Sequence, residues 1–147
     1  MGRKLIAIGN RLMGDDGIAI YLAESMKAYL EKIGFDVIIG ETDISYCLSK
    51  IETNDFIIIL DAFYHGLKPG SVSMITLKEA ASKIRQYYSQ HEPNIIKCLD
   101  IYNIDVTGLV IGIEVNEIEF KWELSDVMKD LFPQICEQVK DTIIKIL

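Results

Sequence analysis

The sequence predicts an α/β protein, a three-layer α/β/α sandwich built around a mostly parallel, twisted sheet. Short apolar runs alternate along the chain with longer segments of helical periodicity, which is the pattern of a parallel sheet with crossover helices. The runs are continuous rather than alternating, as in strands that are buried on both faces. With no repeat and no linker among its 147 residues, the chain is expected to form a single domain over residues 1–147.

The first half of the chain carries three of the expected strands. The run of residues 56–60 is the most apolar of these and is expected to form a central parallel strand. Gly34 is suited to end the first helix, and Asp43 is suited to cap the second. The expected strands are 4–8, 35–39 and 56–60, and the expected helices are 15–33 (or 17–33) and 43–51.

The second half continues the alternation. Residues 71–77 alternate only moderately, which indicates a strand near an edge. Pro93 suits the first turn of a helix, and Ser125 is a good N-cap for the closing helix, which Pro133 is expected to bend or split. The expected strands are 71–77 and 107–114, and the expected helices are 78–88, 93–102 and 125–147.

Composition excludes several classes of protein. The formal net charge is -7 and the chain has no basic stripe, so we expect no nucleic-acid partner. Charged residues interrupt every apolar run before it reaches the length of a membrane span, which predicts no membrane insertion. The opening apolar stretch, residues 5–8, is too short for a signal sequence. Three widely spaced cysteines without a CxxC pair predict buried thiols rather than disulfides, which suits the cytoplasm.

Carboxylates follow two of the expected parallel strands. Asp15 and Asp16 come shortly after the first strand, and Asp61 directly follows the central one. The carboxyl ends of parallel strands form the ligand-binding edge of an open sheet, so Asp61 should emerge close to Asp16. His91 lies in a connection that is able to reach the same edge. Two carboxylates and an imidazole suit a divalent first-row metal. The alternative is that the aspartates are only caps and that His91 is exposed to solvent.

Other chemistries are less well supported. The chain contains no P-loop, dinucleotide fingerprint, GxSxG elbow or HExxH helix. Cys98 lies inside an expected helix with nothing to activate it as a nucleophile for His91. His65 is expected to be a solvated loop residue. Trp122, the only tryptophan, is expected to be a lid over the core, with an interface anchor as the alternative.

Residues 9–17, with the sequence GNRLMGDDG, resemble the amino-terminal signature of the hydrogenase maturation endopeptidases. The order Asp16, Asp61, His91 matches the three metal-contacting positions of that family, and the resemblance spans nearly the whole chain. Two positions depart from the pattern. Ala7 stands where the family often has glycine, and Asp16 stands where some members have glutamate, which shortens the reach to a metal by one methylene.

The resemblance implies a cytoplasmic, monomeric hydrolase, an aspartic-type endopeptidase that activates its substrate. The substrate would be the precursor of a nickel-iron hydrogenase large subunit, loaded with nickel, from which a C-terminal peptide is removed. Asp16, Asp61 and His91 would contact that nickel, and cadmium could replace it. Asp15 would support the site or cap its helix. Both a water activated by the ion and a substrate-assisted route with a carboxylate as base stay open. The sequence does not indicate which hydrogenase is the substrate.

Two other functions stay open. One is a non-enzymatic nickel-binding or chaperone domain that uses the same three ligands. The other is a phosphorylase-like enzyme acting on a small molecule, for which Arg11 would be the phosphate-binding residue. For partner recognition, the candidates are apolar residues near the metal edge, namely Phe63, Tyr64 and Trp122.

Overall fold

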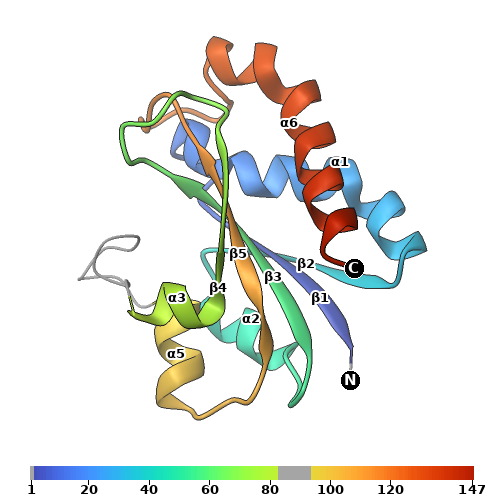
Figure 1. Cartoon of the computed structure of the whole chain (residues 1–147). Helices are drawn as coiled ribbons and strands as arrows, with labels where there is room; N and C mark the ends of the chain where they lie inside the picture. The colour runs from blue at the N-terminus through green and yellow to red at the C-terminus, as the bar shows by residue number, and fades with distance from the viewer. Residues whose placement is uncertain (1, 83–93) are drawn as a thin grey trace.

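The computed structural model describes residues 2–82 and 94–147, and within them the strands and helices alternate as expected (Figure 1). The strands are β1 (Arg3–Ile8), β2 (Phe35–Glu41), β3 (Phe56–Phe63), β4 (Val72–Thr76) and β5 (Thr107–Glu114). The helices are η1 (Gly14–Gly17), α1 (Ile18–Lys32), α2 (Ile44–Ser49), α3 (Leu77–Ser82), α5 (Ile95–Ile101) and α6 (Asp126–Lys145), of which η1 is a single 3-10 turn.

The sheet has the order β2-β1-β3-β5-β4, with β3 at its centre. The first four strands of this order are parallel, and β4 runs antiparallel to β5 at one edge. The expectations of a mostly parallel sheet, of a central strand at 56–60 and of an edge strand at 71–77 are therefore confirmed. In the register of β1 and β3, Ala7 pairs with Leu60 near the carboxyl edge, and β3 continues beyond this pair to Phe63, so that Asp61 lies within β3.

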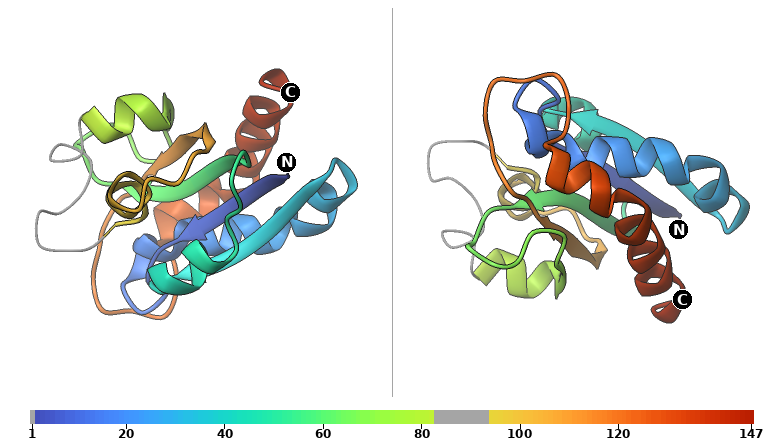
Figure 2. Two further views of the ribbon diagram at one scale, coloured as in Figure 1. Left: turned by 90° about the horizontal axis from the view of Figure 1, so that it is seen from below. Right: turned by 90° about the horizontal axis from the view of Figure 1, so that it is seen from above.

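Helices cover both faces of the sheet, which confirms the three-layer sandwich (Figure 2). Because successive side chains of a strand point to opposite faces, Leu5 and Ala7 pack against α1 and α6, whereas Ile6 packs against the smaller helices. The same division holds on β3 for Ile58 and Ile59. This two-sided burial explains why the strands are continuous apolar runs.

Local capping chemistry sets several of the helix ends. Asp43 accepts a hydrogen bond from Tyr46 N at 2.9 Å, and Ser125 accepts one from Met128 N at 3.3 Å, so both are N-caps as expected. Gly34 follows α1 with φ +95°, a left-handed conformation that glycine adopts without strain. Pro133 lies inside α6 and does not split it.

The helix expected at 93–102 begins at Ile95, with Asn94 as its N-cap. Pro93 lies outside the described residues, as does the part of the expected helix 78–88 beyond Ser82. None of the helices in the described ranges is long and apolar enough to cross a membrane.

The three cysteines are free thiols. Cys47 and Cys136 are buried as expected, whereas Cys98 is only partly buried because it lies on the side of α5 that reaches the surface. Burial raises the pKa of Cys47 to about 11 and also raises that of Cys136, so both thiols stay protonated and unreactive near neutral pH.

Candidate active site

A tight loop joins β1 to η1 and carries the paired aspartates to the carboxyl edge. Gly9, with φ +155°, lies so close to η1 that a Cβ there would be 2.2 Å from the carbonyl oxygen of Asp16. Only glycine fits this approach. Asn10 closes the turn, because its side chain accepts a hydrogen bond from Leu12 N at 2.9 Å.

Asp16 and Asp61 lie at the same edge of the sheet. Asp61 follows Leu60, the partner of Ala7, while Asp16 contacts the end of β1 through Gly9, and η1 packs on β3. Both side chains are half-buried. Asp16 Oδ2 accepts the Asn10 N–H at 2.9 Å, and Asp61 Oδ1 accepts the Ala62 N–H at 2.8 Å, so backbone groups orient both carboxylates. The strand register agrees with the predicted position at the carboxyl edge, and the metal-binding role of the two residues stays a prediction.

His91, the third predicted ligand, lies outside the described residues. Within residues 2–82 and 94–147, no three His, Cys, Asp or Glu side chains are grouped as a metal site. A first-row ion held by Asp16 and Asp61 would therefore need a further ligand, and an imidazole is of the right chemical type.

Asp15 has a different role from the adjacent Asp16. It is fully buried and caps neither η1 nor α1, so of the two expected roles, support for the site or a helix cap, the cap is wrong. Its carboxylate instead accepts four hydrogen bonds from the connection between β5 and α6. They come from the N–H groups of Asn116 (3.1 Å), Glu117 (2.9 Å) and Ser125 (2.7 Å) and from the Ser125 hydroxyl (2.9 Å). Asp15 thus fixes the loop 116–124 against the Asp16 turn.

Glu114 is a second buried carboxylate at this edge, and it was not among the predicted residues. It ends β5 opposite Phe63 and is 2 % exposed. Its oxygens accept the His65 N–H at 2.9 and 3.2 Å, so it anchors the connection that follows β3. His65 itself is exposed, as expected. An acidic residue at the end of a buried apolar run is the same signal that identified Asp61.

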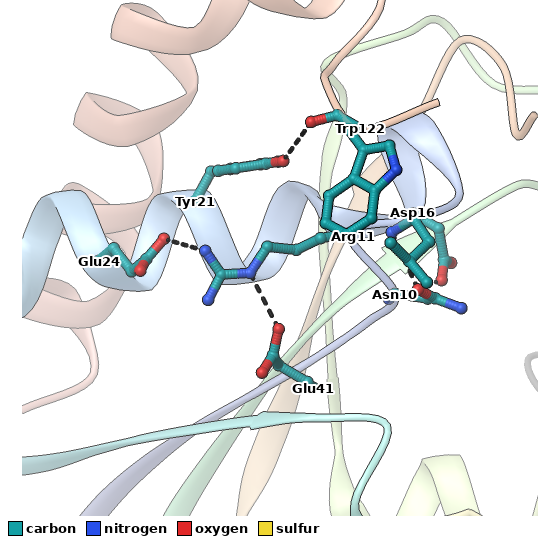
Figure 3. A network of polar contacts seen from close by, with 8 residues as sticks. Asn10, Arg11, Asp16, Tyr21, Glu24, Glu41 and Trp122 are labelled. Carbon is teal, nitrogen blue, oxygen red and sulfur yellow. Dashed lines mark hydrogen bonds and ion pairs between the residues drawn. The ribbon is translucent and has the colours of Figure 1, made fainter. Parts of the chain in front are cut away.

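Arg11 projects from the same loop between two glutamates (Figure 3). Its Nε and a terminal guanidinium nitrogen each lie 2.9 Å from a carboxylate oxygen, of Glu41 and Glu24 respectively. The hydrogen bond to Glu41 contributes most to raising the pKa of Arg11, with Glu24 adding to it. Because two carboxylates already hold the guanidinium, this arrangement does not favour the phosphate-binding role of a phosphorylase-like enzyme.

Trp122 is 71 % exposed, so the expectation that it forms a lid over the core is wrong. The backbone explains this position. Lys121 N donates to the carbonyl of Leu12, and Gly14 N donates to the carbonyl of Lys121, both at 2.9 Å, which fixes the loop across the Asp16 turn. Trp122 therefore lies at the surface, where it lines the same hollow as Arg11 (Figure 3).

Comparisons with known proteins give the same picture. Several solved structures have this fold over nearly the whole chain. HybD, a [NiFe] hydrogenase maturation protease from Thermococcus kodakarensis, is 27 % identical with a TM-score of 0.74, and the match covers 97 % of this chain and 99 % of that one. The hydrogenase maturating endopeptidase HybD from E. coli is 18 % identical with a TM-score of 0.78, covering 99 % and 93 %. The endopeptidase HycI from Escherichia coli is 26 % identical with a TM-score of 0.64, covering 93 % and 88 %.

The family comparison agrees. Residues 20–142 match the family model HycI, described as hydrogenase maturation protease, a range that includes Asp61 and His91 and begins after Asp16. No curated protein matches the sequence. The fold and the family define the class of protein: the chain is a peptidase, a hydrolase. It belongs to the hydrogenase maturation protease family.

Proposed function

We propose that the chain is a cytoplasmic endopeptidase that removes a C-terminal peptide from the nickel-loaded precursor of a [NiFe]-hydrogenase large subunit. The observation that supports this most directly is the pair of half-buried carboxylates, Asp16 and Asp61, at the ligand-binding edge of a maturation-protease fold. Family membership favours this function over a non-enzymatic nickel-binding domain.

In this proposal the nickel arrives as part of the substrate. Asp16, Asp61 and His91 contact it and so place the scissile bond at the carboxyl edge. Carboxylate and imidazole ligands suit nickel, and cadmium can replace nickel at these ligands as a probe. The backbone bonds from Asn10 and Ala62 hold the two carboxylates in position before the substrate binds, which lowers the cost of ordering them.

The test is cleavage of purified nickel-loaded precursor, followed by mass spectrometry of the large subunit. We expect Asp16→Asn and Asp61→Asn each to slow cleavage at least a hundredfold while leaving the melting temperature within a few degrees. Asp141→Asn, an exposed carboxylate on α6, is the matched control and should cleave normally. Precursor without nickel should stay intact.

Normal cleavage by both aspartate variants would contradict the proposed role of Asp16 and Asp61. Cleavage of metal-free precursor at the same rate as nickel-loaded precursor would contradict nickel recognition, although the chain would still act as a peptidase.

A further inference from the structure

Trp122 separates two hollows in the surface next to the Asp16 turn. One has a volume of about 360 Å³ and a mostly apolar lining, and the other has a volume of about 560 Å³ and lies over the loop that follows β1. We call the two together the Trp122 groove. The first is lined by Tyr21, Trp122, Glu123, Leu124, Lys129 and Phe132, and the second by Gly9, Asn10, Arg11, Leu12, Tyr21, Glu41, Thr42 and Trp122.

The groove reaches the loop that orients Asp16. Asn10 lines the second hollow, and its N–H is the group bound to Asp16 Oδ2 at 2.9 Å. Trp122 and Tyr21 line both hollows, and the Tyr21 hydroxyl donates to the Trp122 carbonyl at 3.3 Å. A polypeptide lying along the second hollow would therefore contact Asn10, the residue whose N–H orients Asp16.

Hydrogen bonds fix the loop that carries Trp122 in the groove. Asp15 accepts four hydrogen bonds from the two ends of the loop that carries Trp122, and Lys121 is paired with the Asp16 turn. A surface that is fixed before binding loses little conformational freedom when a partner docks. An exposed tryptophan on such a support is typical of a binding anchor.

The charges around the groove favour an uncharged or basic occupant. Among the described residues that line it, the cations are Arg11 and Lys129. Arg11 is paired with Glu24 and Glu41, and Lys129 lies 2.7 Å from a Glu123 oxygen. An acidic segment would therefore compete with glutamates for both cations, whereas a large apolar side chain meets Trp122, Leu124 and Phe132.

We propose that the Trp122 groove holds an extended segment of the protein substrate, next to the bond that is cut, through a large apolar side chain without acidic neighbours. This inference rests on the proposed function and adds the means by which the polypeptide itself, and not only its metal, is recognised. The smaller hollow, close to the smallest size typical of ligand pockets, takes one such side chain.

The first experiment is steady-state cleavage of nickel-loaded precursor by Trp122→Ala. We expect KM to rise about tenfold with kcat within twofold of the unchanged enzyme, because the lost contact is made before and during the reaction alike. Trp122→Phe should restore most of the loss. Tyr102→Ala removes a side chain of similar exposure (67 %) at the opposite end of the sheet and should leave KM unchanged. An unchanged KM in Trp122→Ala overturns the proposal.

The second experiment needs no cleavage. Because Trp122 is the only tryptophan, its fluorescence reports the groove alone when the probe contains none. The probes are tryptophan-free octapeptides of Gly, Ser and Lys with one central Leu. We expect a saturable blue shift, weakened about tenfold when Leu is replaced by Ala or when each Lys is replaced by Glu. No shift, or the same shift with all three peptides, overturns the proposal.

The two experiments separate the possible failures. If the Leu peptide binds but nickel-loaded precursor is not cut, the docking surface stands and the proposed function fails. If the precursor is cut with normal KM by Trp122→Ala, the proposed function stands and the docking surface fails. A blue-shifted emission that grows with protein concentration, together with a dimer in sedimentation, would show that a second copy occupies the groove and would also overturn the proposal.

Discussion

Asp15 and Asp16 are adjacent, yet the structure gives them different environments. Asp15 is fully buried and bonded to a segment more than one hundred residues away, while Asp16 is half-buried at the carboxyl edge. A buried carboxylate that accepts four hydrogen bonds is costly to remove, because its donors are left without partners. Burial and bonding therefore distinguish a supporting residue from a candidate catalytic one.

This difference gives a direct prediction. We expect Asp15→Ala to lower the free energy of unfolding by about 3 kcal/mol. Asp16→Ala, at a half-buried position, should lower it by no more than about 1 kcal/mol. Urea denaturation followed by circular dichroism measures both values. Equal losses in the two variants would contradict the division of roles.

Lys4 and Asp55 form a buried ion pair at the amino end of the sheet, with Nζ and Oδ2 2.8 Å apart. Burial by itself would raise the pKa of Asp55. Hydrogen bonds from Lys4 Nζ and from the N–H groups of Glu52 and Gly2 outweigh that effect, so the pKa of Asp55 lies below its ordinary value. The folded state thus binds this proton less readily than the unfolded chain.

The stabilisation from Asp55 is therefore complete above the unfolded pKa of about 3.9 and is lost as the pH falls through the lower folded pKa. We expect Asp55→Asn to be about 3 kcal/mol less stable at pH 7, because Lys4 is left buried without its counter-charge. The difference should shrink in strong acid. Urea titrations between pH 2 and 7 check this, with the exposed Asp36→Asn as control. A difference that grows in acid would contradict the sign.

The helices and strands were predictable wherever the decisive signal is local. The apolar run Phe56–Leu60 indicated a central strand, and Asp43 and Ser125 indicated helix starts, because strand burial and capping depend on neighbours in the sequence. The exposure of Trp122 was not predictable in this way. It depends on pairing between Lys121 and the Asp16 turn, two segments that meet only in the folded chain.

The same limit applies to the candidate site. Topology alone brought Asp16 and Asp61 to one edge, because parallel strands share their carboxyl ends. The anchoring roles of Asp15 and Glu114 depend on hydrogen bonds to backbone groups of distant or irregular segments, which leave no periodic signal.

The turn between β1 and η1 is the element on which the position of Asp16 depends. Gly9→Ala would place a Cβ 2.2 Å from the Asp16 carbonyl oxygen, so the turn has to move. We expect a loss of about 2 kcal/mol in stability and at least a tenfold loss of cleavage activity, since a displacement of about 1 Å is enough to misplace a reacting group.

Gly66→Ala is the matched control for this variant. Gly66 also has a positive φ, +79°, but a Cβ there meets nothing within 4 Å. It should cost only about 1 kcal/mol, the penalty of the backbone conformation alone. Similar losses of stability and activity in both variants would show that the contact with Asp16 is unimportant.

The whole molecule rests on one sheet with an apolar layer on each face. Ile58 belongs to the layer under α1 and α6, and Ile59 to the layer under the smaller helices. We expect Ile58→Ala and Ile59→Ala each to lower stability by about 3 kcal/mol, because either one leaves a cavity in a closed core.

The prediction of a single domain is tested by the same unfolding experiment. Cys136 reports the first layer and Cys47 the second, since each thiol is buried there. In a single cooperative unit, both thiols become reactive at the same urea concentration as the circular dichroism is lost. Labelling of one thiol well before the other would show two independent units.

The hydrogen bonds of Asp15 also join the Asp16 turn to a part of the chain that is synthesised much later. They join a turn near the start of the chain to Asn116 and to Ser125, which are 101 and 110 residues further on. A ribosome needs roughly 5 to 20 s to add that many residues. The nascent chain can pair β1 with β2 and β3 well before then, but its Asp16 turn lacks the hydrogen bonds to the late loop until that loop has been made. A nascent chain that ends before Asn116 therefore already contains Asp16, Asp61 and His91, but not the loop that fixes the Asp16 turn.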